Sequence, residues 1–276
     1  MPVTDLIADA SDRLSPAERR VADAVVSDPA RVAFGTVASL ASDAGVSGPT
    51  VVRLAAKLGY DGFASLQDDV QRELARQLRP AAERIRAERA TDVLGRTLDT
   101  EVANVTATLE RADRRTFDRS AALLADPRRA VWVLAGEATA GIASTIAANL
   151  DLLRADVATI TGTPLAVARQ VERVERGDVV LVLEVRRYER WVVDALDTVR
   201  DRAAIVAITD SVVAPVAEGA KATFVVDAAG PGPFDSHVAT LALGNALVAE
   251  VASRLRRTAT PRLDAVEQAT AELLLD

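Results

Sequence analysis

The chain contains no cysteine, a single histidine and only 3% aromatic residues among its 276 positions. Without cysteine it has neither a disulfide framework nor thiol chemistry, and one histidine is too few for a histidine-based metal cluster, so we expect no metal site and no cofactor. No apolar run approaches the roughly 20 residues that a membrane span needs. The N-terminus also lacks the basic-then-apolar order of a signal peptide, which predicts a cytoplasmic protein without a membrane partner.

The composition is otherwise that of an ordinary globular protein, with 49% hydrophobic and 26% charged residues and a net charge of −7. A net negative charge disfavours binding of nucleic acid to the protein surface as a whole. It does not exclude DNA, because a bound duplex is exposed only to the face of the protein turned toward it. A chain of this length is long for one domain and sufficient for two.

Two different sequence patterns along the chain predict where these domains lie. Residues 1–79 consist of short helical segments joined by tight turns, and residues 111–276 alternate strand-like and helical segments. Residues 80–110 contain no strand-like run, so we interpret them as a connector with a loop around Pro80 followed by a long helix. Apolar residues recur in it at three- and four-residue spacings, as on one helix face that packs on the second domain: Leu94, Leu98, Val102, Val105 and Leu109.

The sharpest local signal is "VASLASDAGVSGPTVVRLAAKLGY", residues 37–60. Gly45 stands where a first helix must reverse, and glycine adopts the required left-handed conformation without steric cost. Ser47 suits the N-cap of the next helix, and Pro49 is tolerated in its first turn. The pattern predicts two short helices that cross over a small core, a helix-turn-helix. That core is expected to comprise Leu40, Ala44, Val46, Val51 and Leu54.

The outward positions of the second helix suit DNA, because hydroxyls at a helix start and cations further along contact phosphates and base edges. An ordinary helical hairpin with a solvated pair of cations is the simpler alternative. We favour DNA binding because the small, apolar and glycine positions all match together. The outward positions are expected to be Ser47, Gly48, Pro49, Thr50, Val52, Arg53 and Lys57, of which Ser47, Pro49, Thr50, Arg53 and Lys57 are predicted to contact DNA.

The flanking sequence supports this unit. "LSPAERRVADAVVSDP" predicts a capped helix that begins near Ser15 and ends before Pro29, and a closing helix is expected from about Phe63. The motifs "LSPAERRVADAV" and "VVRLAAKLGYDGFASLQ", with the hairpin between them, resemble the N-terminal domain of the RpiR family of bacterial transcription regulators. That resemblance covers about 75 residues and implies that the second helix of the hairpin faces DNA.

The second half contains the strand-like runs "AVWVLA", "DVATIT", "DVVLVLEV", "AAIVAITD" and "ATFVVDAA". Nearly continuous apolar strands that alternate with helices indicate a parallel sheet covered by helices on both faces. Ligands of such sheets bind beyond the carboxyl ends of the strands, where the strand order reverses. The segments "ITDS" and "FDSHVATLALGNALVAEV" make residues 115–256 similar to a SIS (sugar isomerase) domain. The predicted fold is therefore an all-α helix-turn-helix domain followed by an α/β domain with a flavodoxin-like parallel sheet.

The resemblance fails at the loops that hold ligand in SIS domains. Those that bind phosphosugars carry a G-x-G-x-S turn after the first strand and an S-x-S-G-x-T loop after the third. Here the turn reads "GEATAG", and the loop reads "EVRRYE". Glu184 and Arg186 stand where the serines belong, Arg187 replaces the glycine and Glu189 the threonine. Two carboxylates repel a phosphate, so we predict that the usual phosphosugar cradle is not used.

Three interpretations of this loop remain open. The arginines could hold an anion. Alternatively, Glu137, Glu184, Arg186, Arg187 and Glu189 pair with one another and fill the site. In the third interpretation, the loop holds a different ligand. The candidate effector site comprises Gly136, Glu137, Thr139, Glu184, Arg186, Tyr188, Glu189, Ser211, Ser236 and His237.

His237 is the one residue that suggests an enzyme, because a general base near neutral pH is often histidine. We interpret it instead as a residue that lines the pocket beside a capping Ser236, since no positioned substrate is evident. No catalytic residue is therefore expected. The sequence predicts a transcription regulator that is not an enzyme. By resemblance, it forms a homodimer or tetramer through its SIS domain, binds a palindromic double-stranded operator and either senses a small-molecule effector or only oligomerises. The alternative is a sugar-phosphate isomerase with an accessory helical domain.

Overall fold

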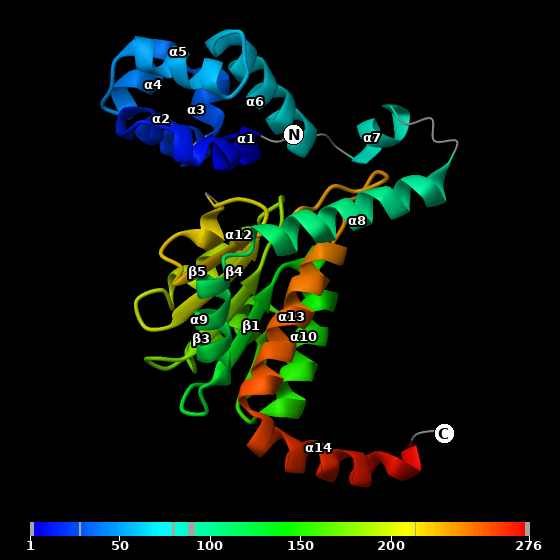
Figure 1. Cartoon of the computed structure of the whole chain (residues 1–276). Coiled ribbons are helices and arrows are strands. Elements are labelled where there is room, and N and C mark those ends of the chain that lie inside the picture. The colour runs from blue at the N-terminus through cyan, green and yellow to red at the C-terminus, as the bar shows by residue number, and fades with distance from the viewer. Residues whose placement is uncertain (1–2, 28, 79–80, 88–91, 213, 274–276) are drawn as a thin grey trace. The chain divides into compact units, whose positions relative to one another are not determined.

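The computed structural model describes residues 3–27, 29–78, 81–87, 92–212 and 214–273. The chain forms two compact units, residues 1–87 and 88–276, which are described separately (Figure 1). The loop expected around Pro80 lies outside the described residues. Of the described helices, none alone is long and apolar enough to span a membrane, and only α13 and α14, bent by 104° relative to each other, reach that length and composition as a pair.

Unit 1 is entirely helical in its described part. The predicted helix after Ser15 and the predicted closing helix from Phe63 are both confirmed, and a short helix that the sequence did not reveal, α3, lies between the first of them and the hairpin. Gln67 of the closing helix donates to the carbonyls of Val32 and Gly35, both at 2.8 Å, and thereby satisfies the end of α3. The helices are α1 (Val3–Ala10), α2 (Pro16–Ser27), α3 (Pro29–Phe34), α4 (Val37–Asp43), α5 (Gly48–Lys57), α6 (Phe63–Leu78) and α7 (Ala81–Ala87).

The hairpin of α4 and α5 has the predicted geometry. Gly45 has φ +61°, and the amides of Gly45 and Val46 donate back to Ser42 and Ala41, which satisfies the last carbonyls of α4. Val51 and Leu54 are fully buried against α4 and α2. Burial of a leucine or valine side chain contributes about 1.5–3 kcal/mol, so these two residues fix the crossing of the two helices.

Unit 2 contains the predicted parallel sheet, with the strand order β2-β1-β3-β4-β5. All four neighbouring pairs are parallel. The chain adds β2 on one side of β1 and then crosses to add β3 on the other, so the order reverses between β1 and β3. The strands are β1 (Val131–Ala135), β2 (Val157–Ile160), β3 (Val179–Leu183), β4 (Ala204–Thr209) and β5 (Ala222–Val225).

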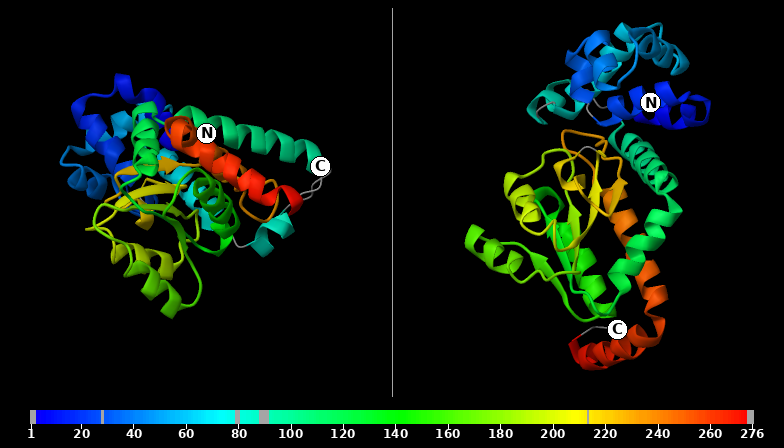
Figure 2. Two further views of the ribbon diagram at one scale, coloured as in Figure 1. Left: turned by 90° about the horizontal axis from the view of Figure 1, so that it is seen from below. Right: turned by 90° about the vertical axis from the view of Figure 1, so that its left-hand side faces the viewer.

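Helices cover both faces of this sheet, because alternate strand residues point to opposite sides. Val131 and Val133 pack with α9, α10 and α13, whereas Trp132 and Leu134 pack with α11 and α12. Figure 2 shows these two helical layers from other directions. The helices of unit 2 are α8 (Val93–Arg111), α9 (Arg114–Ala125), α10 (Ala140–Leu153), α11 (Pro164–Val171), α12 (Arg190–Asp197), α13 (Val238–Arg254) and α14 (Arg256–Thr270).

Helix α8 corrects one expectation. It does pack on the second unit, but through Asn104 and Thr108, whose side chains bond the backbone of Ala229 and Asp227 at 2.7 and 2.9 Å. The apolar row that was expected to face the domain is instead directed outward. Its exposed members are Leu94, Leu98, Val102 and Leu109, with 85, 65, 57 and 40% of their surface accessible.

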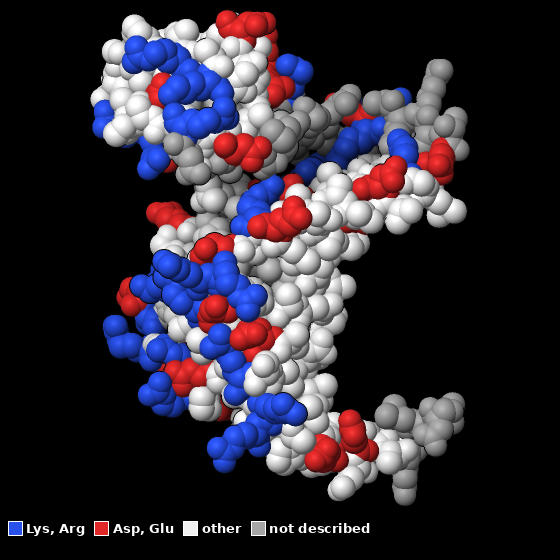
Figure 3. All heavy atoms as spheres, viewed as in Figure 1, with Lys and Arg blue, Asp and Glu red and all other residues white. Residues whose placement is uncertain are grey.

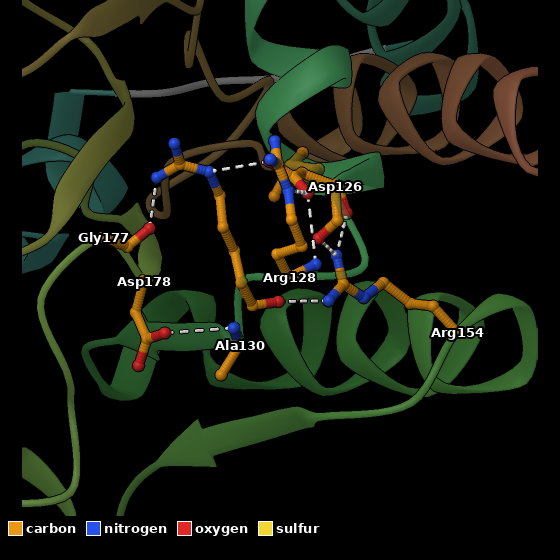
Figure 4. A network of polar contacts seen from close by, with 8 residues as sticks. Asp126, Arg128, Ala130, Arg154, Gly177 and Asp178 are labelled. Carbon is orange, nitrogen blue, oxygen red and sulfur yellow. Dashed lines mark hydrogen bonds and ion pairs between the residues drawn. The ribbon is translucent and has the colours of Figure 1, made fainter.

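The amino ends of the strands are held by buried charges, shown in Figure 4. The guanidinium of Arg154 donates to the carbonyls of Leu124 and Asp126 at 2.6 and 3.0 Å, and also to that of Arg129. The carboxylate of Asp178 accepts the amide of Ala130 and the indole N–H of Trp132, both at 3.0 Å. These groups lie at the sheet edge opposite the carboxyl ends of the strands, so they serve the fold rather than a ligand site.

Candidate nucleic-acid interface and ligand site

Helix α5 presents a short polar row at its start. Ser47 and Pro49 are exposed, as is Arg53 one turn later. Thr50 was expected to point outward, and this is wrong, since only 4% of its surface is accessible. Thr50 therefore belongs to the buried face of α5, together with Val51 and Leu54.

The buried hydroxyl of Thr50 joins its two exposed neighbours. Its Oγ1 atom lies 3.1 Å from the hydroxyl oxygen of Ser47 and accepts a hydrogen bond of 3.0 Å from the guanidinium of Arg53. Because the three residues are spaced by three, they lie on one side of the helix. The hydroxyl thereby restricts the orientation of Arg53, which leaves other guanidinium donors for a partner. Ser47 takes the predicted N-cap position, but its side chain makes no capping bond.

Lys57, the last residue of α5, is bound within its own unit. Its ammonium donates to Glu18 Oε2 at 2.7 Å and to the carbonyl of Arg13 at 2.9 Å. Glu18 also accepts the amide of Ser15 at 2.8 Å, in a capping box that begins α2. The hydrogen bond from Lys57, followed by that from Ser15, lowers the pKa of Glu18 to about 2. Lys57 therefore fixes the end of α5 to the start of α2.

Arginine and lysine side chains gather on the face of unit 1 that carries α4 and α5 (Figure 3). Arg20 of α2 donates to the carbonyl of Ala44 at 3.3 Å, which places a further cation beside the turn of the hairpin. Although the whole chain is acidic, this face offers positive charge to a phosphate backbone.

In unit 2, the candidate site lies at the reversal of strand order. Gly136 follows β1 and Glu184 follows β3, and these strands are neighbours. After Gly136, the turn Glu137–Thr139 runs directly into α10, so the backbone amide of Glu137 lies at the positive end of a helix.

Two glutamates crowd this turn. A Cβ atom built on Gly136 would collide with the carboxylate oxygens of Glu184 and Glu189, so a larger residue here would displace both carboxylates. Glu189 accepts the amide of Glu137 and, at 2.6 Å, the indole N–H of Trp191. Glu184 is 3% exposed, and its Oε1 atom has no hydrogen-bond partner among the described residues. Burial, followed by the charge of Glu189, raises the pKa of Glu184 to about 7.

The rest of the loop pairs with other segments. Arg186 forms an ion pair of 2.8 Å with Asp235, and Tyr188 donates to Asp210 at 2.9 Å. Arg186 has φ +65°, and the amide of Arg187 donates to the carbonyl of Val185 across it, which closes a tight three-residue turn. Of the three interpretations left open, mutual pairing of the loop arginines and glutamates does not hold for Arg186, which pairs with Asp235 instead. The side chains of Arg187 and Glu137 are exposed.

The hydroxyls expected around the site are engaged in the fold. Thr139 donates to the carbonyl of Leu183 at 2.8 Å, and Ser236 donates to Glu101 of α8 at 2.6 Å. His237 is half-buried at the start of α13, and burial lowers its pKa. Ser211 is half-buried beyond β4.

Sequence reasoning missed the partners that hold these residues. Asp210 and Asp235 lie within the segments "ITDS" and "FDSH", which were expected at the carboxyl edge of the sheet. No spacing rule in the sequence, however, identifies them as the partners of Arg186 and Tyr188. Glu101 and Trp191 likewise reach the site from helices that were considered for other reasons.

Comparison with known families agrees with this architecture. Residues 1–77 match the model described as "Helix-turn-helix domain, rpiR family", and residues 123–250 match the SIS domain. Among curated proteins, the chain is similar to the HTH-type transcriptional regulator HexR of Pseudomonas aeruginosa. The two are 26% identical over 200 residues, which cover 71% of this chain and 68% of HexR.

Two solved structures share the fold. The NanR protein of Vibrio vulnificus, solved with ManNAc-6P, is 18% identical and covers the whole of both chains with a TM-score of 0.58. The sugar isomerase domain of an RpiR transcription factor from Sphaerobacter thermophilus is 26% identical. It covers 64% of this chain and 99% of that domain, also with a TM-score of 0.58.

Proposed function

This chain belongs to the RpiR family of DNA-binding transcriptional regulators, and we propose that it binds a two-fold-symmetric DNA site as a homodimer or a dimer of dimers. The observation that carries the proposal is the hydrogen-bonded row of Ser47, Thr50 and Arg53 at the start of α5. In a helix-turn-helix, the N-terminal part of the second helix meets the base edges in the major groove. We propose that the protein acts in the cytoplasm, in keeping with a role in DNA binding.

We assign separate roles to the residues of this interface. Arg53 is the base or phosphate contact, and Ser47 and Pro49 lie against the backbone where the helix enters the groove. Thr50 positions Arg53. Lys57, because it is bound to Glu18, positions the whole helix rather than contacting DNA with a free ammonium.

We propose that unit 2 binds a second copy of the chain. The exposed row on α8, which contains Leu98 and Val102, is too apolar to be left in water without cost. Helices α10 and α13 are also poor in charge, since residues 138–150 and 238–249 contain no charged side chain. In Figure 3 this side of unit 2 is nearly free of charge. Apolar surface that matches itself across a two-fold axis is typical of homodimer interfaces.

We propose that unit 2 is not an enzyme and that any effector acts at the turn after β1, near Gly136 and Glu184. A catalytic site needs a positioned base and free polar groups, whereas Thr139 and Ser236 are bonded within the fold. An effector would shift the arrangement of the two DNA-binding units only by binding one arrangement more tightly than the other.

Selection of binding sites from random double-stranded DNA with the full chain tests the proposal. We expect an inverted repeat. Selected sequences without any repeat, or binding by a stable monomer, would contradict it.

A further inference from the structure

The turn after β1 presents the backbone amide of Glu137 at the start of a helix. Residues Glu137–Thr139 continue without a break into α10, so the amide of Glu137 belongs to the first turn of the helix. Such amides have no partner inside the helix and carry its positive partial charge, which suits an anionic oxygen. In this chain the amide of Glu137 already has such a partner, the carboxylate of Glu189.

The second carboxyl, that of Glu184, lies beside the first. Both approach the same face of Gly136, where a Cβ atom would collide with each of them. Glu184 is almost fully buried, and its Oε1 atom lacks a hydrogen-bond donor among the described residues. Burial, and then the negative charge of the neighbouring Glu189, raise the pKa of Glu184.

The loop that carries the pair is fixed in place. Trp191 holds Glu189, Asp235 holds Arg186, and Asp210 holds Tyr188. Arg186 adopts a left-handed backbone conformation that is strained for a residue other than glycine. Such backbone strain persists only where the surrounding contacts hold the residue in place. The fold therefore fixes the position of the two carboxyls.

We propose that Glu184 and Glu189 act as an internal anion that occupies a phosphate-binding turn of this chain and excludes external phosphate monoesters from it. The two carboxyls supply oxygen acceptors and a negative charge at the helix start, which are the features by which a phosphate is recognised there. An external phosphate would have to displace Glu189 from both Glu137 and Trp191 and would be repelled by the remaining carboxylate. The proposal concerns unit 2 alone and holds whether or not α5 binds DNA.

The test restores the turn by substitution. Calorimetry of the full chain with inorganic phosphate and with glucose 6-phosphate, and with glucose as the neutral control, should give no binding to the unsubstituted protein at millimolar concentrations. The double variant Glu184→Ser, Glu189→Thr replaces both carboxyls by hydroxyls and should bind the two phosphates at least about tenfold more tightly, without binding glucose. The control Glu172→Thr, Asp194→Ser removes the same charge from exposed positions and should bind no more than the unsubstituted chain.

Circular dichroism shows whether the double variant is folded. The proposal of an internal anion is overturned if the double variant is folded and does not bind phosphate. It is also overturned if the unsubstituted chain binds glucose 6-phosphate as tightly as the variant does. If the double variant does not fold, the isosteric Glu189→Gln takes its place. It removes the charge and keeps an acceptor for Trp191, so phosphate affinity that stays at the unsubstituted level would equally overturn the proposal.

Discussion

The ammonium of Lys57, at the end of α5, lies 2.7 Å from the carboxylate of Glu18 in the first turn of α2. Because Glu18 also closes the capping box with Ser15, one buried carboxylate joins α5, the helix that we propose faces DNA, to α2, which packs against it. The orientation of α5 thus depends on a contact between residues 39 positions apart.

This contact predicts an acid-sensitive unit 1. The folded-state pKa of Glu18 is about 2, below its ordinary value of 4.5, so its stabilisation is present above pH 4.5 and is lost as the pH falls through about 2. In Glu18→Gln, the dependence of unfolding free energy on pH in this window should be reduced, as measured by urea unfolding of the full chain followed by a unit 1 signal. Asp61→Asn, which removes a carboxylate from an exposed position of the same unit, is the matched control and should change the slope less.

Arg53→Ala should weaken DNA binding without unfolding the chain, because its side chain lies outside the core. A base contact predicts a loss of about 1–3 kcal/mol at one position of the site, whereas a phosphate contact predicts that the salt slope falls by about one. Fluorescence anisotropy at several salt concentrations distinguishes the two. Unchanged affinity together with an unchanged salt slope would remove α5 from the interface.

The positioning role of Thr50 has its own test. Thr50→Val keeps the shape of the buried side chain and removes the hydroxyl, so it should weaken binding less than Arg53→Ala does. In a double-mutant cycle, Thr50→Val should have little further effect once Arg53 is alanine. Additive losses would show that Thr50 acts independently of Arg53.

Glu184 predicts the opposite pH dependence in unit 2. Its pKa is raised in the fold to about 7, so its contribution to stability is fully present below pH 4.5 and is lost as the pH rises through about 7. Glu184→Gln should therefore flatten the decline in the unfolding free energy of unit 2 between pH 5 and pH 8. A decline that persists unchanged in the variant would assign it to another group.

Leu98→Asp should dissociate the proposed homodimer, because it places a charge in the middle of the exposed apolar row on α8. Light scattering after size-exclusion chromatography gives the mass directly. Leu165 of α11 is similarly exposed, at 62%, but lies on the other layer of the sheet, so Leu165→Asp should leave the dimer intact. Dissociation by the second substitution and not by the first would place the interface on the other layer.

Asp178→Ala should lower the free energy of unfolding by at least about 2 kcal/mol, since it leaves the amide of Ala130 and the indole of Trp132 buried without an acceptor. Asp194→Ala, at an exposed position, should change it by no more than about 0.5 kcal/mol. Urea unfolding compares the two.

Local signals in the sequence predicted local structure well. The glycine reversal at Gly45, the core positions Val51 and Leu54 and the parallel strands all follow from backbone preference and apolar spacing, and they were confirmed. The outward position of Thr50 was wrong because the period of a ten-residue helix does not define the edge of its buried face to within one residue.

Long-range pairing could not be predicted in the same way. Spacing rules showed that residues 94–109 form an apolar helix face, but they do not say whether that face is covered by the same chain or by a second copy. The pairs Lys57–Glu18 and Arg186–Asp235 join segments 39 and 49 positions apart, and charge alone does not select such partners. Glu184 was marked as unusual by its place in the loop, yet its shifted pKa depends on burial that only the fold creates.

The spacing of the two half-sites tests most directly whether two α5 helices bind DNA together. An insertion of about five base pairs, half a helical turn, between the halves of the selected site rotates one half to the opposite face of the duplex. The account predicts that affinity falls to that of an isolated half-site, with two or four chains per intact site. Affinity that is unchanged by the insertion, or one chain per site, would contradict it.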